Sequence, residues 1–253
     1  MMTYAPHAEH PIALVTGASR GLGRALADAL ADRGWRLIID GRDHAALASA
    51  AAAFGDRTRV EAVTGDVADA AHRRDLAAAV RAAGGLDLLV NNAGSLGPSP
   101  RPALADVDEA ALADTYSTNA IAPLLLFQAV RAVLDPAGVV INITSDAARA
   151  HWPGWGVYGS SKAALEHLTG VLAAEHPQLA VYTVDPGDLR TAMHQAAFPG
   201  EDISDRLLPE AVVPAVLSLV SRRPASGRYR VADLPGEDGA AAVVGRDATS
   251  GAP

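Results

Sequence analysis

The sequence contains no cysteine, and this absence excludes several kinds of site at once. Without thiols the chain forms no disulfide, binds no metal through thiolates and has no cysteine nucleophile. Disulfide-free chains suit a reducing compartment, so a cytoplasmic location is expected. Aromatic residues are also scarce, at 4% of the chain. The hydrophobic core must therefore be built mostly from alanine, valine, leucine and isoleucine.

Excess positive charge and long apolar runs are missing as well. The net charge of −8 argues against a nucleic-acid partner or an anionic membrane surface. The longest apolar run, 120–130, is interrupted by Pro123 and Gln128 and is too short to span a membrane. Residues 1–11 lack the basic and apolar parts of a signal peptide and are expected to be flexible. The histidines are scattered, so no metal site is expected.

From residue 12 onward, short apolar runs alternate with segments of helical periodicity. Strands are predicted at 12–16, 35–40, 59–64, 86–90, 139–144, 179–184 and 227–231. Helices are predicted from a glycine turn to Arg33 and at 43–54, 70–83, 108–134, 157–175 and 209–221, whereas 190–205 is expected to be loosely structured. This alternation is typical of right-handed βαβ units. The sequence thus predicts one α/β domain at 12–235, doubly wound around a mainly parallel sheet, followed by a disordered tail at 236–253.

Tyr158 and Lys162 are the first candidates for chemistry, because they are four residues apart in a predicted helix. That spacing places both side chains on one helix face. An ammonium beside a phenol favours the phenolate, so Lys162 is expected to lower the pKa of Tyr158 from its ordinary value of about 10. A tyrosine tuned in this way can act as a general acid or base toward an alcohol or a carbonyl oxygen.

A glycine-rich turn follows the first predicted strand. Thr16 is followed by glycines at 17, 21 and 23 and then by a helix. Glycines allow backbone conformations and close approaches that a Cβ would block, and the N-terminus of the next helix attracts a pyrophosphate. The turn in this position predicts a dinucleotide site, although its spacing departs from the general G-x-G-x-x-G pattern.

Seven motifs occur in order along the chain: the glycine turn at 16–23, Asp66-Val67, the sequence Asn-Asn-Ala-Gly at 91–94, Asn119, Ser145, Tyr158-x-x-x-Lys162, and Pro186-Gly187 with Thr191. Together they resemble the short-chain dehydrogenase/reductase family, in its compact branch of about 250 residues, over roughly 12–219. The resemblance implies a Rossmann fold with seven strands in the order 3-2-1-4-5-6-7. It also implies a nicotinamide cofactor across the carboxyl ends of the strands.

Residue by residue, the resemblance assigns the glycine turn to the pyrophosphate, Asp66 and Val67 to the adenine, and Pro186, Gly187 and Thr191 to the carboxamide of the nicotinamide. Asn92 is left open as a purely structural residue. The full set of cofactor-binding residues that it implies is Gly17, Ser19, Arg20, Gly21, Leu22, Gly23, Arg42, Asp66, Val67, Asn91, Ala93, Gly94, Tyr158, Lys162, Pro186, Gly187, Leu189 and Thr191.

The choice between NADP(H) and NAD(H) depends on residues 40–42. An acid at the end of the second strand binds the ribose 2′-hydroxyl of NAD, whereas a nearby arginine accommodates the 2′-phosphate of NADP. In the family's count the selecting position is Gly41, with Arg42 next to it and Arg20 as a second base. Two guanidiniums suit a phosphate, so NADP(H) is favoured. NAD(H) stays open if Asp40 reaches the ribose.

The mechanism that the resemblance implies is hydride transfer between the cofactor and a ketone, aldehyde or alcohol. Tyr158 would transfer the proton, Ser145 would orient the oxygen, Lys162 would also bind the ribose, and Asn119 would hold a relay water. The substrate pocket is expected between 95–98, the segment with Trp152 and Trp155, and 190–205. His194 is either a substrate contact or a surface residue of that last segment.

The assembly and the function class keep alternatives. A homodimer through 108–134 and 157–175 is expected, because the C-terminal part departs from the segment with which many members form a homotetramer. The alternatives to an NADP(H)-dependent carbonyl reductase are an NAD(H)-dependent alcohol dehydrogenase, an epimerase or dehydratase, and a catalytically silent cofactor-binding regulatory protein. The last two are disfavoured, because the chain lacks room for a larger substrate domain and its Ser/Tyr/Lys set is intact.

Overall fold

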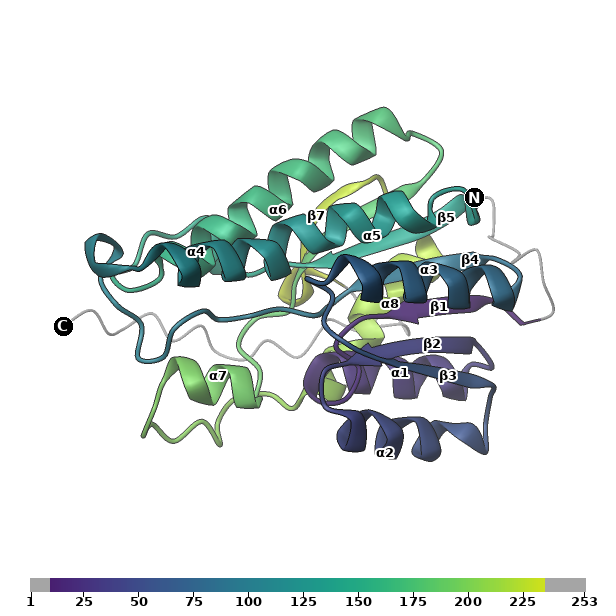
Figure 1. Ribbon diagram of the computed structural model, residues 1–253, viewed down its shortest axis with the longest axis horizontal. Coiled ribbons are helices and arrows are strands. Elements are labelled where there is room, and N and C mark those ends of the chain that lie inside the picture. The colour runs from purple at the N-terminus through teal and green to yellow at the C-terminus, as the bar shows by residue number, and fades with distance from the viewer. Residues whose placement is uncertain (1–9, 235–253) are drawn as a thin grey trace.

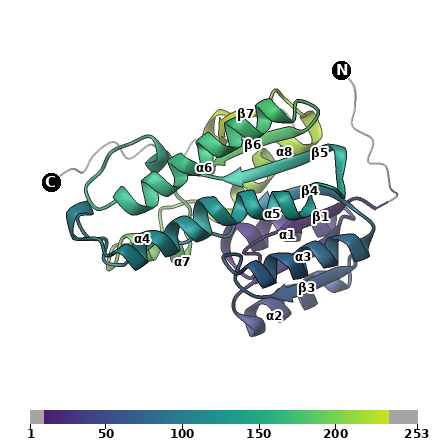
Figure 2. The same cartoon turned by 45° about the horizontal axis from the view of Figure 1, so that its top comes forward.

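The structure, a computed structural model, describes residues 10–234. Seven parallel strands form one sheet in the order β3-β2-β1-β4-β5-β6-β7, as the family resemblance implied. Figures 1 and 2 show the helices wrapped around it. The predicted flexible segments, apart from residues 10 and 11, lie outside the described residues.

The strands are short and mostly buried. Their bounds are β1 Ile12–Val15, β2 Arg36–Gly41, β3 Val60–Thr64, β4 Leu86–Asn91, β5 Leu134–Ile143, β6 Ala180–Asp185 and β7 Gly227–Arg230. The register pairs Leu14 with Ile38 on one side and with Leu89 on the other. β1 therefore lies in the middle of the N-terminal half of the sheet, and the glycine turn that follows it begins at the carboxyl edge.

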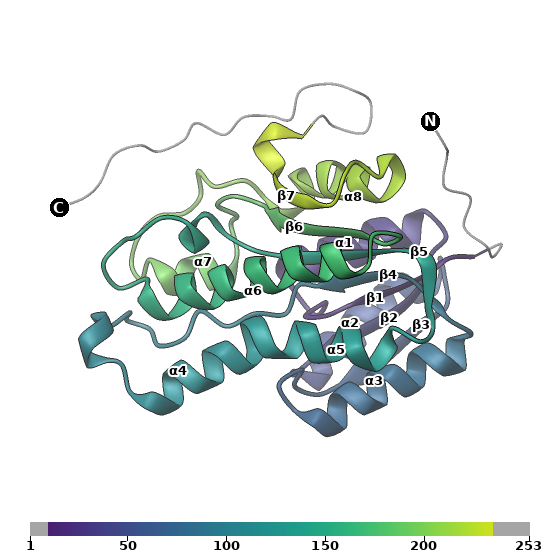
Figure 3. The same ribbon diagram turned by 90° about the horizontal axis from the view of Figure 1, so that it is seen from above.

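Two apolar clusters cover the two faces of the sheet. One face packs against α1 Gly21–Asp32, α2 His44–Gly55 and α8 Val213–Arg222. The other face packs against α3 Ala70–Ala83, α5 Ala122–Val130 and α6 Gly156–Glu175. The two helical layers are visible from above in Figure 3. The chain is thus doubly wound, with helices on both faces, as predicted.

The predicted helix at 108–134 is wrong as one continuous element. The structure has α4 Glu109–Tyr116, a π-helical turn Ser117–Ile121 and then α5, which ends at Val130. After that the chain pairs with the sheet, since Leu86 donates its N–H to the carbonyl of Val133. The apolar residues 133 and 134 continue the helical pattern in the sequence, but in the structure their backbone pairs with Leu86 of β4. A π-turn inside a helix often marks a functional position, and this one carries Asn119.

The segment 190–205 contains one more helix than expected. α7, Ala192–Ala197, is capped by Thr191, whose hydroxyl accepts the N–H of His194 at 3.2 Å. In Figure 1 α7 stands apart from the layered body, on the side where the strands end. Among residues 10–234, no helix is both long and apolar enough to cross a membrane.

Candidate active site

The glycine turn after β1 is required by the space around it. Gly17 has φ +66°, and a Cβ there would lie 2.9 Å from Cα of Ala93. A Cβ on Gly23 would lie 2.3 Å from Nδ2 of Asn92 and 2.5 Å from the carbonyl oxygen of Gly17. Both positions are closer than any real Cβ contact, so only glycine fits. The turn thus brings bare backbone to the carboxyl edge of the sheet.

The N-terminus of α1 is free to bind an anion. Arg20 occupies the N-cap position with extended backbone, no side chain caps the first turn, and no acidic residue lies in it. Leu22 is buried in the core, so only its backbone faces the turn. Uncapped N–H groups and the positive end of the helix dipole fit a pyrophosphate. The residues present therefore match the dinucleotide that the sequence predicted.

Thr16 and Asn92 hold this turn, and the sequence reasoning gave Thr16 no role. The Thr16 hydroxyl accepts the N–H groups of Asn92 and Ala93, each at 3.0 Å. The Asn92 amide donates to the carbonyl of Thr16 at 2.9 Å and to that of Gly17 at 3.3 Å. Asn92 is thus structural, the alternative that the sequence left open. A hydroxyl residue directly before the glycines was the available signal for Thr16.

Asn91 also points into the protein. Its side chain is buried and donates to Oδ1 of Asn142 at 2.8 Å, and Asn142 in turn donates to Thr169 at 2.8 Å. Val67, by contrast, lines a small hollow together with Thr16, Asn91 and Ala93. This hollow adjoins the end of β4, where the resemblance placed the cofactor.

Asp40 does not point toward a ribose. Its carboxylate is 1% exposed, accepts the N–H of Gly17 at 2.6 Å and lies 3.0 Å from Nε2 of His72. Burial raises the pKa of Asp40, and its hydrogen bonds to His72 and Gly17 oppose that rise. This carboxylate therefore braces the underside of the glycine turn. The condition under which NAD(H) stayed open is not met in this geometry.

The neighbouring position, Gly41, has no room for a side chain and is followed by a basic residue. A Cβ on Gly41 would lie 3.1 Å from Oγ of Ser19, so no carboxylate fits there without displacing it. The Arg42 side chain is 69% exposed, with Nη1 3.7 Å from Oδ2 of Asp66, and Arg20 is exposed as well. A hydroxyl beside a missing side chain, with exposed arginines at 20 and 42, suits a phosphate group.

Asn119 is fully buried at the π-turn. Its amide nitrogen donates to the carbonyl of Ser95 at 2.8 Å and to Oγ of Ser161 at 2.9 Å. Its amide oxygen accepts the N–H of Ser95 at 2.7 Å. The side chain therefore locks the chain after β4 to the middle of α6. The relay water predicted for Asn119 stays a prediction.

Tyr158 and Lys162 lie on one face of α6, with the Lys162 ammonium 5.8 Å from the centre of the Tyr158 ring. The ammonium is buried and donates to the carbonyl of Ile143 at 2.9 Å. Ser145 lies two residues after the end of β5, hydrogen bonds with Tyr158 and donates to Oδ1 of Asp146 at 2.9 Å. The structure thus brings three of the four predicted catalytic residues, Ser145, Tyr158 and Lys162, together.

The prediction that Lys162 lowers the pKa of Tyr158 is wrong for this geometry. Burial raises the pKa of Tyr158, the hydrogen bond with Ser145 opposes this, and the charges of Asp146 and Asp185 raise the pKa further. Burial also lowers the pKa of Lys162 to about 8. Because the ammonium is directed at the Ile143 carbonyl, removal from water dominates for both groups.

A buried charge network adjoins Tyr158, and the sequence reasoning missed it. Arg228 of β7 donates to Oε1 of Glu166 and to Oδ2 of Asp185, both at 2.8 Å. Glu166 also accepts the hydroxyl of Thr144 at 2.9 Å and pairs with Arg149. The network ties the ends of β5 and β6 to α6, so it fixes the strand end that presents Ser145. Charged residues at the ends of apolar strands were the available signal.

The residues that the resemblance assigns to the nicotinamide, Pro186, Gly187 and Thr191, lead directly into α7. Gly187 has φ +73°, and Leu189 is buried and forms a bridge to Leu207. A Cβ on Gly21 would lie 3.6 Å from Cγ2 of Thr191. The residues after Pro186 therefore return to the glycine turn and meet it at the carboxyl edge.

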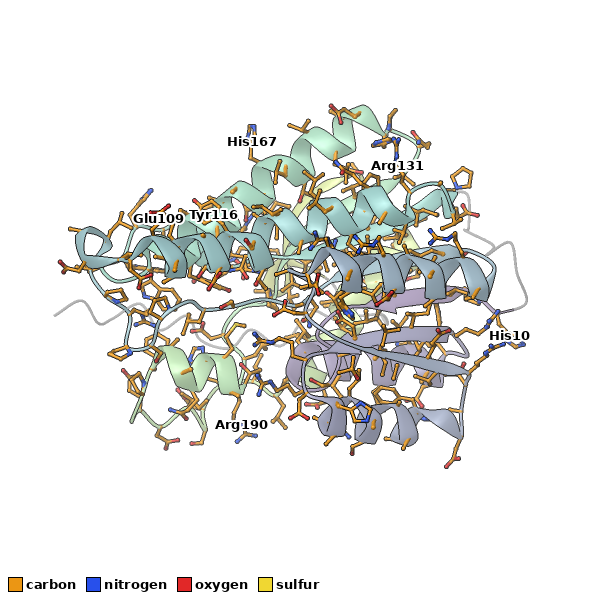
Figure 4. The ribbon with its side chains drawn as sticks, viewed as in Figure 1. His10, Glu109, Tyr116, Arg131, His167 and Arg190 are labelled. Atoms are coloured by element: carbon orange, nitrogen blue, oxygen red, sulfur yellow. The ribbon has the colours of Figure 1, made fainter. Side chains whose placement is uncertain are left out.

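Met193 of α7 lies near the centre of the site. A Cβ on Gly94 would lie 3.7 Å from Cε of Met193, 3.6 Å from Nζ of Lys162 and 3.5 Å from Oδ1 of Asn119. The first turn of α7 thus contacts the residues around Lys162. Figure 4 shows the exposed Arg190 side chain projecting outward beside α7.

An aromatic cluster lies on the side of Tyr158 next to the end of α7. Trp155 lies 5.8 Å from Tyr158, 5.9 Å from Phe198 and 6.2 Å from the half-exposed Trp152, measured between ring centroids. Phe198 ends α7 and stacks on His194 at 4.9 Å. His194 is therefore packed rather than a plain surface residue, and burial lowers its pKa.

The chain matches the family model described as short chain dehydrogenase over residues 11–202. It belongs to the short-chain dehydrogenase family. Among curated relatives, sepiapterin reductase of Xenopus tropicalis is 34% identical over 200 residues, which cover 74% of this chain and 77% of that protein. Gluconate 5-dehydrogenase of Gluconobacter oxydans is 33% identical over 201 residues, 77% of each chain. Relatives in the family are named oxidoreductases, so the chain is an oxidoreductase of this family.

Solved structures of the family share the fold. A short-chain dehydrogenase from Shigella flexneri, complexed with NADP, has a TM-score of 0.81 and 31% identity and covers 87% of this chain and 96% of its own. An alcohol dehydrogenase from Thermococcus sibiricus, complexed with 5-hydroxy-NADP, has a TM-score of 0.79 and 25% identity and covers 88% and 96%.

Proposed function

We propose that this protein is an NADP(H)-dependent oxidoreductase that interconverts a ketone or aldehyde and the corresponding alcohol. The observation that carries the proposal is the cluster of Ser145, Tyr158 and Lys162 at the same sheet edge as the uncapped glycine turn. A proton-transfer group and an anion-binding turn at one edge are what hydride transfer from a dinucleotide requires. The cofactor, when bound, supplies the hydride that reduces the carbonyl carbon.

Tyr158 donates the proton to the carbonyl oxygen as that oxygen gains charge. A phenol whose pKa is raised by burial stays protonated at neutral pH, which suits the acid role in reduction. Ser145 orients the oxygen by a hydrogen bond. Lys162, with its pKa lowered to about 8, can re-protonate the phenolate near neutral pH.

NADP(H) is the preferred cofactor. Ser19 contacts the position of Gly41 and exposed Arg42 follows it in the chain, whereas Asp40 is turned inward to Gly17 and His72. A 2′-phosphate is matched by two guanidiniums, and a free ribose has no carboxylate to bind. The complexes of similar solved structures with NADP and 5-hydroxy-NADP support the same assignment.

The test is the oxidation of NADPH with a panel of ketones and aldehydes, followed by absorbance. Tyr158→Phe should reduce turnover at least 100-fold while NADPH still binds with nearly unchanged affinity, because only the proton donor is lost. Near-normal turnover by this variant would refute the mechanism. A strong preference for NADH would refute the cofactor assignment, and NADPH binding without turnover of any carbonyl would favour a silent regulatory protein.

We further propose that the protein forms a homodimer through α4, α5 and α6. Leu112 of α4, Ile121 of the π-turn and Val171 of α6 are exposed apolar residues on these neighbouring helices. In Figure 4 Tyr116 and His167 project from α4 and α6 on the outer side of this layer. Light scattering should give the mass of a dimer, and a monomer mass would contradict this surface.

A further inference from the structure

Arg101 lies in the loop between β4 and α4, against the aromatic cluster that includes Trp155 and Phe198. The carbon centre of its guanidinium is 4.0 Å from the ring centroid of Trp155 and 5.0 Å from that of Phe198. Trp155 in turn contacts Tyr158, and Phe198 ends α7. A positive charge is thus held between two aromatic rings, and one of them, Trp155, also contacts the proposed proton donor Tyr158.

Within the described residues, the Arg101 guanidinium has no ion-pair partner. Its Nη1 is buried and has no hydrogen-bond partner, and no carboxylate in residues 10–234 lies within ion-pair distance of the guanidinium. Removal from water lowers the pKa of Arg101, and the charge of Glu201 opposes this only from a longer distance. The other arginines near the site differ, since Arg228 and Arg149 both pair with Glu166.

An unpaired, desolvated donor is costly, unless a ligand completes it. Cation–π contact offsets part of that cost. It also fixes the guanidinium in place while leaving its N–H donors unused. A fixed guanidinium with unused donors is the group that binds a carboxylate through two parallel hydrogen bonds. The loop is also tied to α7, because Ser99 donates to the carbonyl of Ala196 at 2.8 Å.

We propose that Arg101 binds a carboxylate of the substrate, so that the substrates are ketones or aldehydes that carry a carboxylate, and the corresponding hydroxy acids. The inference rests on the proposed function, because it names the substrate class of the same site. Arg101 and Tyr158 both contact Trp155. One small molecule can therefore place its carbonyl at Tyr158 and its carboxylate at Arg101. The Nη1 atom is covered in this structure, whereas Arg101 as a whole is only partly buried.

The experiment compares keto acids with their methyl esters, which keep the carbonyl and remove the charge. NADPH oxidation is measured for the wild type, Arg101→Gln, Arg101→Lys and the control Arg74→Gln, which changes an exposed arginine on α3 far from the site. The wild type should prefer at least one acid over its ester about 10- to 100-fold in kcat/KM. Arg101→Gln should abolish that preference, because it lowers kcat/KM for the acid far more than for the ester, and Arg101→Lys should retain part of the preference.

Several results would overturn the inference. If the wild type reduces neutral carbonyls and rejects every keto acid, the substrate class is wrong while the proposed function stands. If Arg101→Gln lowers acid and ester rates equally, Arg101 only supports Trp155. If no carbonyl compound is reduced, the proposed function fails and this inference fails with it. The wild-type ratio of acid to ester decides the matter even if the Arg101 variants do not fold.

Discussion

The glycine turn and the α7 segment meet at one edge of the sheet but are held there by different interactions. The turn is fixed by partly buried hydrogen bonds of Thr16, Asp40 and Asn92, which come from or follow three different strands. The α7 segment is fixed by ring contacts of Phe198 and by one hydrogen bond to Ser99. The glycine turn is therefore built into the core, whereas the α7 segment packs on the surface of the core.

This difference follows from what each side must do. A cofactor with an invariant pyrophosphate can be met by a rigid, preformed cradle. A substrate has to enter and leave, and elements with few buried contacts open at low cost. Changes on the cofactor side should thus alter stability and binding together, whereas changes on the substrate side should alter turnover alone.

Lys162 lies where the two sides meet, and its loss should have the largest effect. Lys162→Met should lower turnover about 100- to 10,000-fold, because the ammonium that re-protonates the Tyr158 phenolate is lost. It should not lower the free energy of unfolding at pH 7, because the wild type must bury a charge whose pKa is lowered to about 8. Urea unfolding and NADPH oxidation measure the two effects.

The pH dependence of that stability difference has a definite sign. In the unfolded chain the pKa of Lys162 is about 10.4, above its folded value of about 8. The unfolded state therefore holds more protons between these values, and the wild type gains stability relative to Lys162→Met as pH rises through this range. A difference that stays constant from pH 7 to pH 10 would mean that burial of the charge costs nothing.

Gly23→Ala tests the cofactor side. Its Cβ would collide with Asn92 and with the Gly17 carbonyl, so the free energy of unfolding should fall by about 1–3 kcal/mol. NADPH affinity should fall at least 10-fold in a fluorescence titration, because the turn itself must shift. The matched control is Gly55→Ala at the end of α2, where a Cβ meets nothing within 4 Å. If the two variants behave alike, the cradle is not rigid.

Phe198→Ala is the counterpart on the substrate side. Phe198 is half-buried and contacts Trp155, His194 and Arg101, so its removal should lower kcat/KM for the carbonyl substrate roughly 10-fold. The melting temperature and the NADPH affinity should stay close to those of the wild type. A loss of melting temperature as large as that of Gly23→Ala would show that both sides belong to one core.

Arg42→Gln should have the smallest effect. The side chain is exposed, and its 3.7 Å ion pair with Asp66 adds little stability. KM for NADPH should rise several-fold, while KM for NADH and the melting temperature should not change. An equal rise for both cofactors would show that Arg42 does not contact the 2′-phosphate.

Much of the fold was predictable because its signals are local. Apolar runs with glycine punctuation predicted most strands to within one or two residues, and α3 lies at the predicted 70–83, but β5 begins at Leu134, five residues before the predicted start. The helix at 108–134 was mispredicted, since residues 133 and 134 are as apolar in a helix as in a strand. Their pairing with Leu86 depends on a neighbour 47 residues away in the chain, which periodicity does not register.

The sequence by itself determined the doubly wound fold, the family and the grouping of Ser145, Tyr158 and Lys162, because strand ends and helix spacing bring these residues to one edge. The tertiary structure decided where Asp40 points and in which direction the pKa values of Tyr158 and Lys162 move. It also decided that Arg101 lies between two rings, with no ion-pair partner among residues 10–234. These properties depend on burial and on contacts between distant segments, and the chain acquires both only when it folds.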